Sequence, residues 1–142
     1  MNDLEKLEKI ILQHEGIEKH AYNDSLGFVT IGIGKCIDRR RGAGLTEDEC
    51  LYLLRNDIER CKEQLSKYTW FTKQDEVRKD AIIELVFNLG ISGFLKFKNT
   101  INMLACKDYV SASKALLDSK WAKQVGPNRS NNIADRIRLG RY

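Results

Sequence analysis

The nine residues 81–89 (AIIELVFNL) constrain the fold more than any other stretch of this chain. They follow a helix-start signal at 72–75 (TKQD), and Gly90 closes them. The run is apolar almost all round the helix, whereas a surface helix shows a single apolar face. We therefore expect a helix surrounded by other helices, at the core of a helical lobe.

Start and stop signals predict further helices on both sides of this run. Asn2 and Glu5 form a capping box whose helix ends at Gly16, and Thr46 with Glu49 opens a second helix to about Ser66. Shorter helices are expected at 93–97, 99–106, 108–117, around Trp121, and from 127 to about 139.

Between the first two helices the hydrophobic period shifts toward two. Residues 17–37, with the turn 23–27 (NDSLG), predict a small, irregular antiparallel sheet that is mostly hairpin. A basic loop is expected at 39–44 (RRRGAG). The predicted fold class is α+β and mostly helical. We expect one domain over 1–142, with a β-rich lobe at about 15–45. A larger helical lobe is expected at about 66–142 together with the N-terminal helix, and the helix from Thr46 joins the lobes.

Composition supports a globular protein and excludes several classes. Hydrophobic residues make up 42% and charged residues 31% of the 142 positions, which argues against disorder. No apolar run approaches the length of a membrane span, and the first 16 residues are a charged amphipathic helix rather than a signal peptide. The chain is therefore expected to be made in the cytoplasm without a stable membrane anchor.

The four cysteines are widely spaced and form no CxxC pair. Cys50 and Cys61 share a helical stripe with Leu51, Leu54 and Ile58, so buried free thiols are expected. Disulfides stay open as an alternative, and the spacing does not suit a zinc site. No metal and no cofactor are predicted.

The net charge of +4 is concentrated near the C-terminus. Residues 119–142 carry six basic side chains and one acidic one, a net charge of +5. A solvated basic helix and attraction to a polyanion both explain this pattern. Nucleic acid is one such polyanion, but no nucleic-acid-binding motif accompanies the charge, so no nucleic-acid partner is predicted.

Two carboxylates near the N-terminus are candidates for acid/base chemistry. Glu15 lies at the end of the first helix, and Asp24 follows nine residues later in a turn. Different environments allow one carboxyl to be protonated while the other is ionised, as glycosidic hydrolysis requires. Taken alone, a glutamate at a helix end and an aspartate in a turn are commonplace, and a purely structural role is the more frequent one. Neither His14 nor His20 completes a Ser-His-Asp or Cys-His arrangement.

The residues that follow Glu15 make the interpretation more specific. Residues 15–34 read E-G-x₇-D-x₂-G-x₂-TIGIG and resemble the catalytic stretch of the phage-type lysozymes, the endolysin family (glycoside hydrolase family 24). The likeness continues over most of the chain. It includes the buried run 81–90, the segment 97–104, the S-K-W motif at 119–121 and the PNR motif at 127–129.

This resemblance implies a bacteriolytic hydrolase for host-cell lysis. Such an enzyme cuts the β-1,4 bond between N-acetylmuramic acid and N-acetylglucosamine in peptidoglycan. Glu15 would be the general acid, while Asp24 and Thr30 would position the attacking water, with inversion at the anomeric carbon. Arg129 matches the arginine that pairs with the catalytic glutamate. The residues implied to contact substrate are Gly34, Phe87, Asn88 and Lys120.

The resemblance also implies how such an enzyme works in a cell. We expect a monomer made in the host cytoplasm that reaches the wall after a holin opens the membrane. Some positions depart from the family: Lys35 stands where the best-known member has a histidine in an ion pair, and Asn88 replaces a longer glutamine. A lysozyme-fold module that binds peptidoglycan or a protein without cutting is the alternative.

Overall fold

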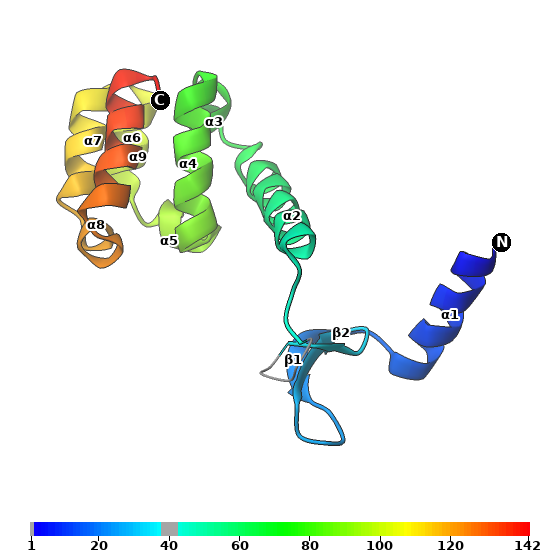
Figure 1. Ribbon diagram of the computed structural model, residues 1–142. Helices are drawn as coiled ribbons and strands as arrows, with labels where there is room; N and C mark the ends of the chain where they lie inside the picture. The colour runs from blue at the N-terminus through cyan, green and yellow to red at the C-terminus, as the bar shows by residue number, and fades with distance from the viewer. Residues whose placement is uncertain (1, 38–42) are drawn as a thin grey trace. The chain divides into compact units, whose positions relative to one another are not determined.

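The computed structural model describes residues 2–37 and 43–142 (Figure 1). Most of the basic loop predicted at 39–44 lies outside the described residues. Two compact units are present, unit 1 over Met1–Tyr52 and unit 2 over Leu53–Tyr142. The expectation that the N-terminal helix belongs with the helical lobe in one domain stays a prediction.

Unit 1 contains one helix and a small sheet. Helix α1 (Asp3–Glu15) begins at the predicted capping box, where Asn2 and Glu5 exchange side-chain and backbone hydrogen bonds of 2.8 and 2.9 Å. Gly16, at φ +70°, ends it. Strands β1 (Glu18–Asn23), β2 (Val29–Gly32) and β3 (Lys35–Cys36) pair antiparallel in that order. The predicted hairpin-rich sheet is thus confirmed, with β2 at its centre.

Helix α2 (Glu47–Leu65) runs across the boundary between the two units. Its capping box is formed as predicted: the Glu49 N–H donates to the Thr46 hydroxyl, and the Thr46 N–H donates to the Glu49 carboxylate at 2.9 Å. That backbone hydrogen bond lowers the pKa of Glu49. Lys35 also pairs with Glu49, at 3.4 Å.

Unit 2 is helical. The remaining helices are α3 (Thr69–Thr72), α4 (Glu76–Leu89), α5 (Ile91–Leu95), α6 (Lys98–Ala105), α7 (Tyr109–Leu117), α8 (Lys120–Val125) and α9 (Pro127–Leu139). Each predicted helix is present within about two residues. The four-residue helix α3 was not predicted, because one turn is too short to show a periodic pattern.

The run 81–89 forms the buried part of α4, as predicted. Ala81, Ile82 and Leu85 are fully buried, and α4 packs against α9 and α5 (Figure 1). Helix α4 begins directly after the predicted start signal at 72–75, whose last residue, Asp75, is its N-cap. The fold is therefore α+β and mostly helical, as the pattern predicted.

The cysteine stripe on α2 is only half buried, so one part of that prediction is wrong. Cys61 and Leu65 lie in the core, whereas Cys50, Leu51 and Leu54 are exposed. All four cysteines are free thiols, and burial raises the pKa of Cys61. Among the described helices, none is long and apolar enough to cross a membrane.

Candidate functional site

Glu15 is the last residue of α1, and its side chain is exposed. Gly34, in the turn between β2 and β3, lies directly against it. A Cβ atom at position 34 would lie 2.8 Å from Oε2 of Glu15 and 2.9 Å from its Cδ. The glycine is also at φ +69°, a conformation that side-chain-bearing residues rarely adopt. The GIG motif therefore brings its backbone against the Glu15 carboxylate.

Asp24 occupies the turn between β1 and β2, where the backbone orients its carboxylate. Its Oδ1 accepts hydrogen bonds from the N–H groups of Leu26 and Phe28, both at 2.9 Å. The Asp24 N–H donates to the Phe28 carbonyl at 2.8 Å. This is an Asx-type turn, which asparagine and aspartate favour because the short side chain reaches its own backbone.

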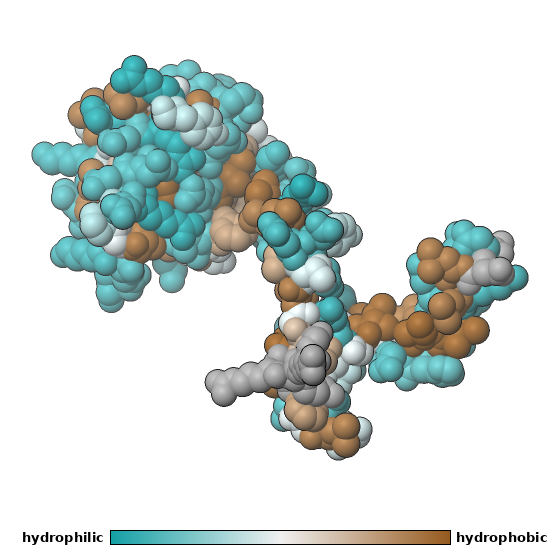
Figure 2. All heavy atoms as spheres, viewed as in Figure 1, coloured by the Kyte–Doolittle hydropathy of each residue, from teal (hydrophilic) through white to brown (hydrophobic). Residues whose placement is uncertain are grey.

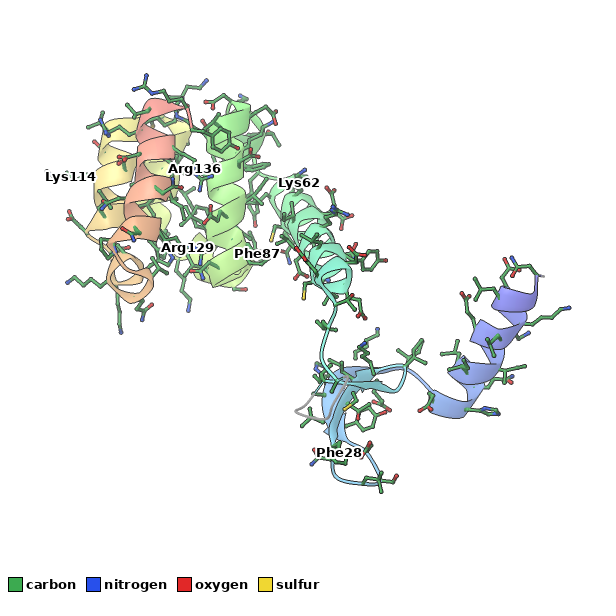
Figure 3. The ribbon with its side chains drawn as sticks, viewed as in Figure 1. Phe28, Lys62, Phe87, Lys114, Arg129 and Arg136 are labelled. Atoms are coloured by element: carbon green, nitrogen blue, oxygen red, sulfur yellow. The ribbon has the colours of Figure 1, made fainter. Side chains whose placement is uncertain are left out.

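Thr30 lies in the central strand β2 and is 3% exposed. Its hydroxyl donates to the Phe28 carbonyl at 3.1 Å. Phe28, labelled in Figure 3, therefore bonds to Asp24 through its N–H and to Thr30 through its carbonyl. Because the hydroxyl proton is committed to Phe28, the oxygen of Thr30 can only accept a hydrogen bond from a further partner.

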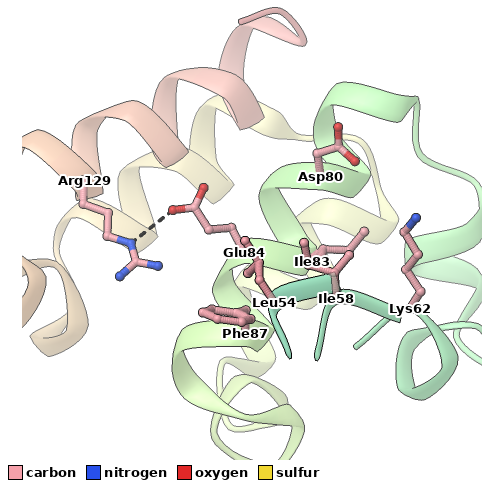
Figure 4. A pocket seen from close by; sticks show the side chains of 8 residues that line it. All are labelled: Leu54, Ile58, Lys62, Asp80, Ile83, Glu84, Phe87 and Arg129. Carbon is pink, nitrogen blue, oxygen red and sulfur yellow. Dashed lines mark hydrogen bonds and ion pairs between the residues drawn. The ribbon is translucent and has the colours of Figure 1, made fainter. Parts of the chain in front are cut away.

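The other predicted site residues belong to unit 2. Phe87 and Arg129 line a pocket of about 470 Å³ (Figure 4). Its apolar wall also contains Leu54, Ile58 and Ile83, and its charged side chains are Lys62, Asp80, Glu84 and Arg129. The Tyr142 hydroxyl donates a hydrogen bond to Asp80, one of these lining residues, and this bond raises the pKa of Tyr142. Phe87 is 43% exposed, so it is a surface residue of α4 rather than part of the core.

Two arginines of α9 share the carboxylate of Glu84 on α4. Arg129 donates from Nε to Oε2 at 3.1 Å, and Arg136 donates to Oε1. Both arginines extend from α9 toward α4 (Figure 3). Glu84 was not among the site residues predicted from the sequence. The available signal was that Glu84 is the only charged residue in the apolar run 81–89, where an acid needs a cationic partner.

Asn88 and Lys120 are placed differently from the Arg129 pocket. The Asn88 side-chain oxygen accepts a 2.8 Å hydrogen bond from the indole N–H of Trp121, which is 3% exposed and belongs to the core. Lys120 lines a separate pocket of about 660 Å³ that also contains Trp121 and Phe97. The side-chain oxygen of Asn88 is thus already hydrogen-bonded within unit 2.

The structure connects the predicted residues in two groups, one in each unit. In unit 1, Glu15 contacts Gly34, while Asp24 and Thr30 are joined through Phe28. In unit 2, Arg129 is bound to Glu84. In the described part of the chain, no group of three or more His, Cys, Asp or Glu side chains could hold a metal ion. An exposed carboxyl and a backbone-oriented carboxylate suit acid/base hydrolysis.

Comparisons with known proteins place the chain among lysozymes and endolysins. The family model described as phage lysozyme matches residues 12–136. A probable T4-type lysozyme of Dictyostelium discoideum is 29% identical over an alignment of 153 positions that spans 89% of each chain. The endolysin of Salmonella phage P22 is 29% identical over 116 residues, covering 78% of this chain and 77% of its own. An endolysin of an Acyrthosiphon pisum secondary endosymbiont phage is also 29% identical, covering 80% of this chain and 75% of its own.

Proposed function

The chain belongs to the phage lysozyme family and is a hydrolase of the lysozyme class, and from this premise we propose that it is a muramidase. Its substrate is peptidoglycan, and the bond cut is the β-1,4 linkage between N-acetylmuramic acid and N-acetylglucosamine. One observation carries the proposal: the family match over residues 12–136 includes Glu15, Asp24, Thr30 and Arg129.

In the proposed reaction Glu15 is the general acid. It donates its proton to the glycosidic oxygen as the bond to the anomeric carbon breaks. A water attacks that carbon from the opposite face, and Asp24 accepts the proton of this water. The product is inverted, for which carboxyl groups roughly 6.5–9.5 Å apart are typical. Proton exchange with solvent returns both carboxyl groups to their starting states.

The contacts around Asp24 and Thr30 support these roles. Oδ1 of Asp24 is held by two backbone N–H groups, which fixes the plane of the carboxylate. Since the Thr30 hydroxyl donates to Phe28, its oxygen would accept a hydrogen bond from the attacking water. That bond would orient one water hydrogen and leave the other for Asp24.

The remaining predicted residues have supporting roles in this proposal. Arg129 pairs with the Glu15 carboxylate, and Gly34, Phe87, Asn88 and Lys120 contact the sugar chain or its substituents. Phe87 is an exposed aromatic side chain, which suits stacking on a sugar ring. Asn88 can contact substrate through its amide N–H₂ while its oxygen stays bonded to Trp121.

We further propose that the enzyme is a monomer that is made in the bacterial cytoplasm and acts on the wall after release. The endolysins among its relatives are phage proteins by name. Access to the wall then requires a membrane lesion, which a holin would supply. The net charge of +4 favours adsorption to an anionic envelope.

The test is digestion of purified peptidoglycan by wild type and Glu15→Gln. New reducing ends on muramic acid, formed by wild type alone, support the muramidase and the role of Glu15. The anomer released first, followed by proton NMR, reports inversion. Anhydro-muramic ends would instead identify a lytic transglycosylase and contradict the water role of Asp24. If both proteins bind peptidoglycan and neither cleaves it, the muramidase proposal is wrong and a non-catalytic binding module is supported instead.

A further inference from the structure

Glu84 is the charged residue within the otherwise apolar run 81–89 of α4. Its two carboxylate oxygens go to different cations: Oε2 to Nε of Arg129 and Oε1 to Arg136. The side chain of Arg136 is 9% exposed, whereas those of Glu84 and Arg129 are 34% and 38% exposed. The three side chains therefore form a triad with one buried end and one end at the pocket.

The buried end anchors the triad. Arg136 packs within unit 2, and its Nε has no hydrogen-bond partner among the described residues. A buried guanidinium without a counter-ion is strongly unfavourable, so Glu84 is held at this position by Arg136. Glu84 is thereby a fixed acceptor for Arg129 rather than a mobile surface acid.

At the pocket end of the triad, part of the Arg129 guanidinium is left free of Glu84 and can bind a second anion. A guanidinium can grip a carboxylate either through Nε with one terminal nitrogen or through its two terminal nitrogens. The bond to Glu84, drawn as the dashed line in Figure 4, occupies Nε, and neither terminal nitrogen of Arg129 has a hydrogen-bond partner among the described residues. Glu84 thus orients Arg129 so that its terminal pair can receive a second carboxylate.

The charges of the triad favour such a second carboxylate. One acid faces two guanidinium groups, which leaves a net charge of +1. Lys62 and Asp80, which line the same pocket, carry opposite charges and together add no net charge. An additional anion at the terminal nitrogens of Arg129 would therefore neutralise this cluster.

We propose that Glu84 is a positioning residue that presents the terminal nitrogens of Arg129 to the catalytic acid. This inference rests on the proposed function, in which the second carboxylate is that of Glu15. Glu84 does not touch substrate; it acts by preventing Arg129 from rotating and by reducing its positive charge. Removal of the Glu84 charge therefore alters turnover more than substrate binding.

The experiment measures kcat and KM for soluble peptidoglycan fragments with wild type, Glu84→Gln, Arg129→Gln and the double variant. We expect Glu84→Gln to lower kcat about tenfold while KM changes less than about twofold. The same substitution should have no further effect on kcat in the Arg129→Gln background, because its action passes through Arg129. Glu76→Gln is the matched control on the same helix, since Glu76 is 87% exposed and pairs only with Lys79 among the described residues; it should keep wild-type kcat.

Glu84→Gln also leaves the buried Arg136 without its anion and can fail to fold. In that event Glu84→Gln/Arg136→Met removes the buried cation as well and still frees Arg129. It should show the lowered kcat in a folded protein, as checked by circular dichroism.

The outcomes separate this inference from the proposed function. Lowered stability with unchanged kcat per folded molecule, or independent effects of Glu84→Gln and Arg129→Gln, would overturn the positioning role alone. Failure of wild type to form reducing ends would overturn the proposed function. An active wild type with an inactive Glu15→Gln variant and normal Glu84→Gln turnover leaves the function standing and rejects the role of Glu84.

Discussion

Gly34 has no side chain, and its backbone lies directly against the carboxylate of Glu15. The local geometry excludes a larger residue for two separate reasons. The backbone is left-handed, and a methyl group would collide with the acid at 2.8 Å. Gly32 in the same motif has a similar φ of +73°, but a methyl group there would meet no atom within 4 Å. A substitution at Gly32 therefore adds backbone strain alone, whereas a substitution at Gly34 adds the same strain and a collision with Glu15.

We predict that Gly34→Ala lowers kcat at least tenfold, whereas Gly32→Ala leaves kcat within about threefold. Both substitutions carry the same backbone cost of about 1–2 kcal/mol, so their melting temperatures should fall by similar amounts. Turnover of peptidoglycan fragments and thermal unfolding measure the two effects. Equal losses of kcat in both variants would show that the contact with Glu15 has no catalytic consequence.

Asp24 combines a structural and a proposed chemical role in one carboxylate. We predict that Asp24→Asn keeps the turn, because the amide oxygen can still accept from Leu26 and Phe28, while losing at least a hundredfold in kcat. Asp24→Ala should lose both activity and about 1 kcal/mol of stability. Urea unfolding beside kinetics distinguishes the two. An active Asp24→Asn enzyme would rule out proton transfer to this residue.

At the scale of an element, the start of α4 determines how the core helix is held. Asp75 caps it by accepting from the Arg78 N–H at 3.0 Å and from its guanidinium at 2.9 Å. Arg78 in turn stacks on Tyr109 and donates to the carbonyls of Ile137 and Arg138 at the end of α9. One arginine thus connects the beginning of α4 with the end of α9.

The cap makes stability depend on pH. Burial acts to raise the pKa of Asp75, but the hydrogen bonds and charge of Arg78 outweigh it and lower the pKa overall. A lowered pKa means that this contribution is present above the ordinary aspartate value, near 3.9, and is lost as the pH falls through the lowered one.

We therefore predict that Asp75→Ala costs about 1 kcal/mol at pH 7 and progressively less below about pH 4. Urea titrations at pH 7 and pH 2.5 measure the difference. Asp75→Asn is the control, because it keeps an oxygen acceptor for the Arg78 N–H but cannot titrate. A pH-independent cost of Asp75→Ala would contradict the charged cap.

At the scale of the whole molecule, the two units are built very differently. Among the described residues, the members of the buried hydrophobic cluster belong to unit 2, from Cys61 to Ile137. In unit 1 the apolar side chains of α1 are exposed, which Figure 2 shows along that helix. The visible surface of the helical unit in Figure 2 is mostly hydrophilic. Burial of apolar surface is therefore concentrated in unit 2.

We predict that a fragment of residues 46–142, which keeps the capping box of α2, folds alone with a cooperative thermal transition. A fragment of residues 1–45 should show none, because a small sheet and one helix bury too little apolar surface. Circular dichroism melts of both fragments provide the test. A fragment 46–142 without a transition would mean that its core needs unit 1.

The sequence by itself determined the helices and strands and the turn that holds the candidate acid Asp24. Capping boxes, helix periods and turn residues act within a few positions, so Asn2, Thr46 and the turn at Asp24 could be identified without the fold. The all-round apolar run 81–89 identified the core helix because its composition already excludes an exposed face.

Only the tertiary structure decided which side chains meet across elements. Gly34 against Glu15, Glu84 between two arginines of α9, and Trp121 on Asn88 join residues 19, 45, 52 and 33 positions apart. Such pairings depend on how whole helices and strands pack, and no local propensity encodes them. The half-buried stripe of α2 has the same origin: periodicity defines a face, but a face is buried only where another element covers it.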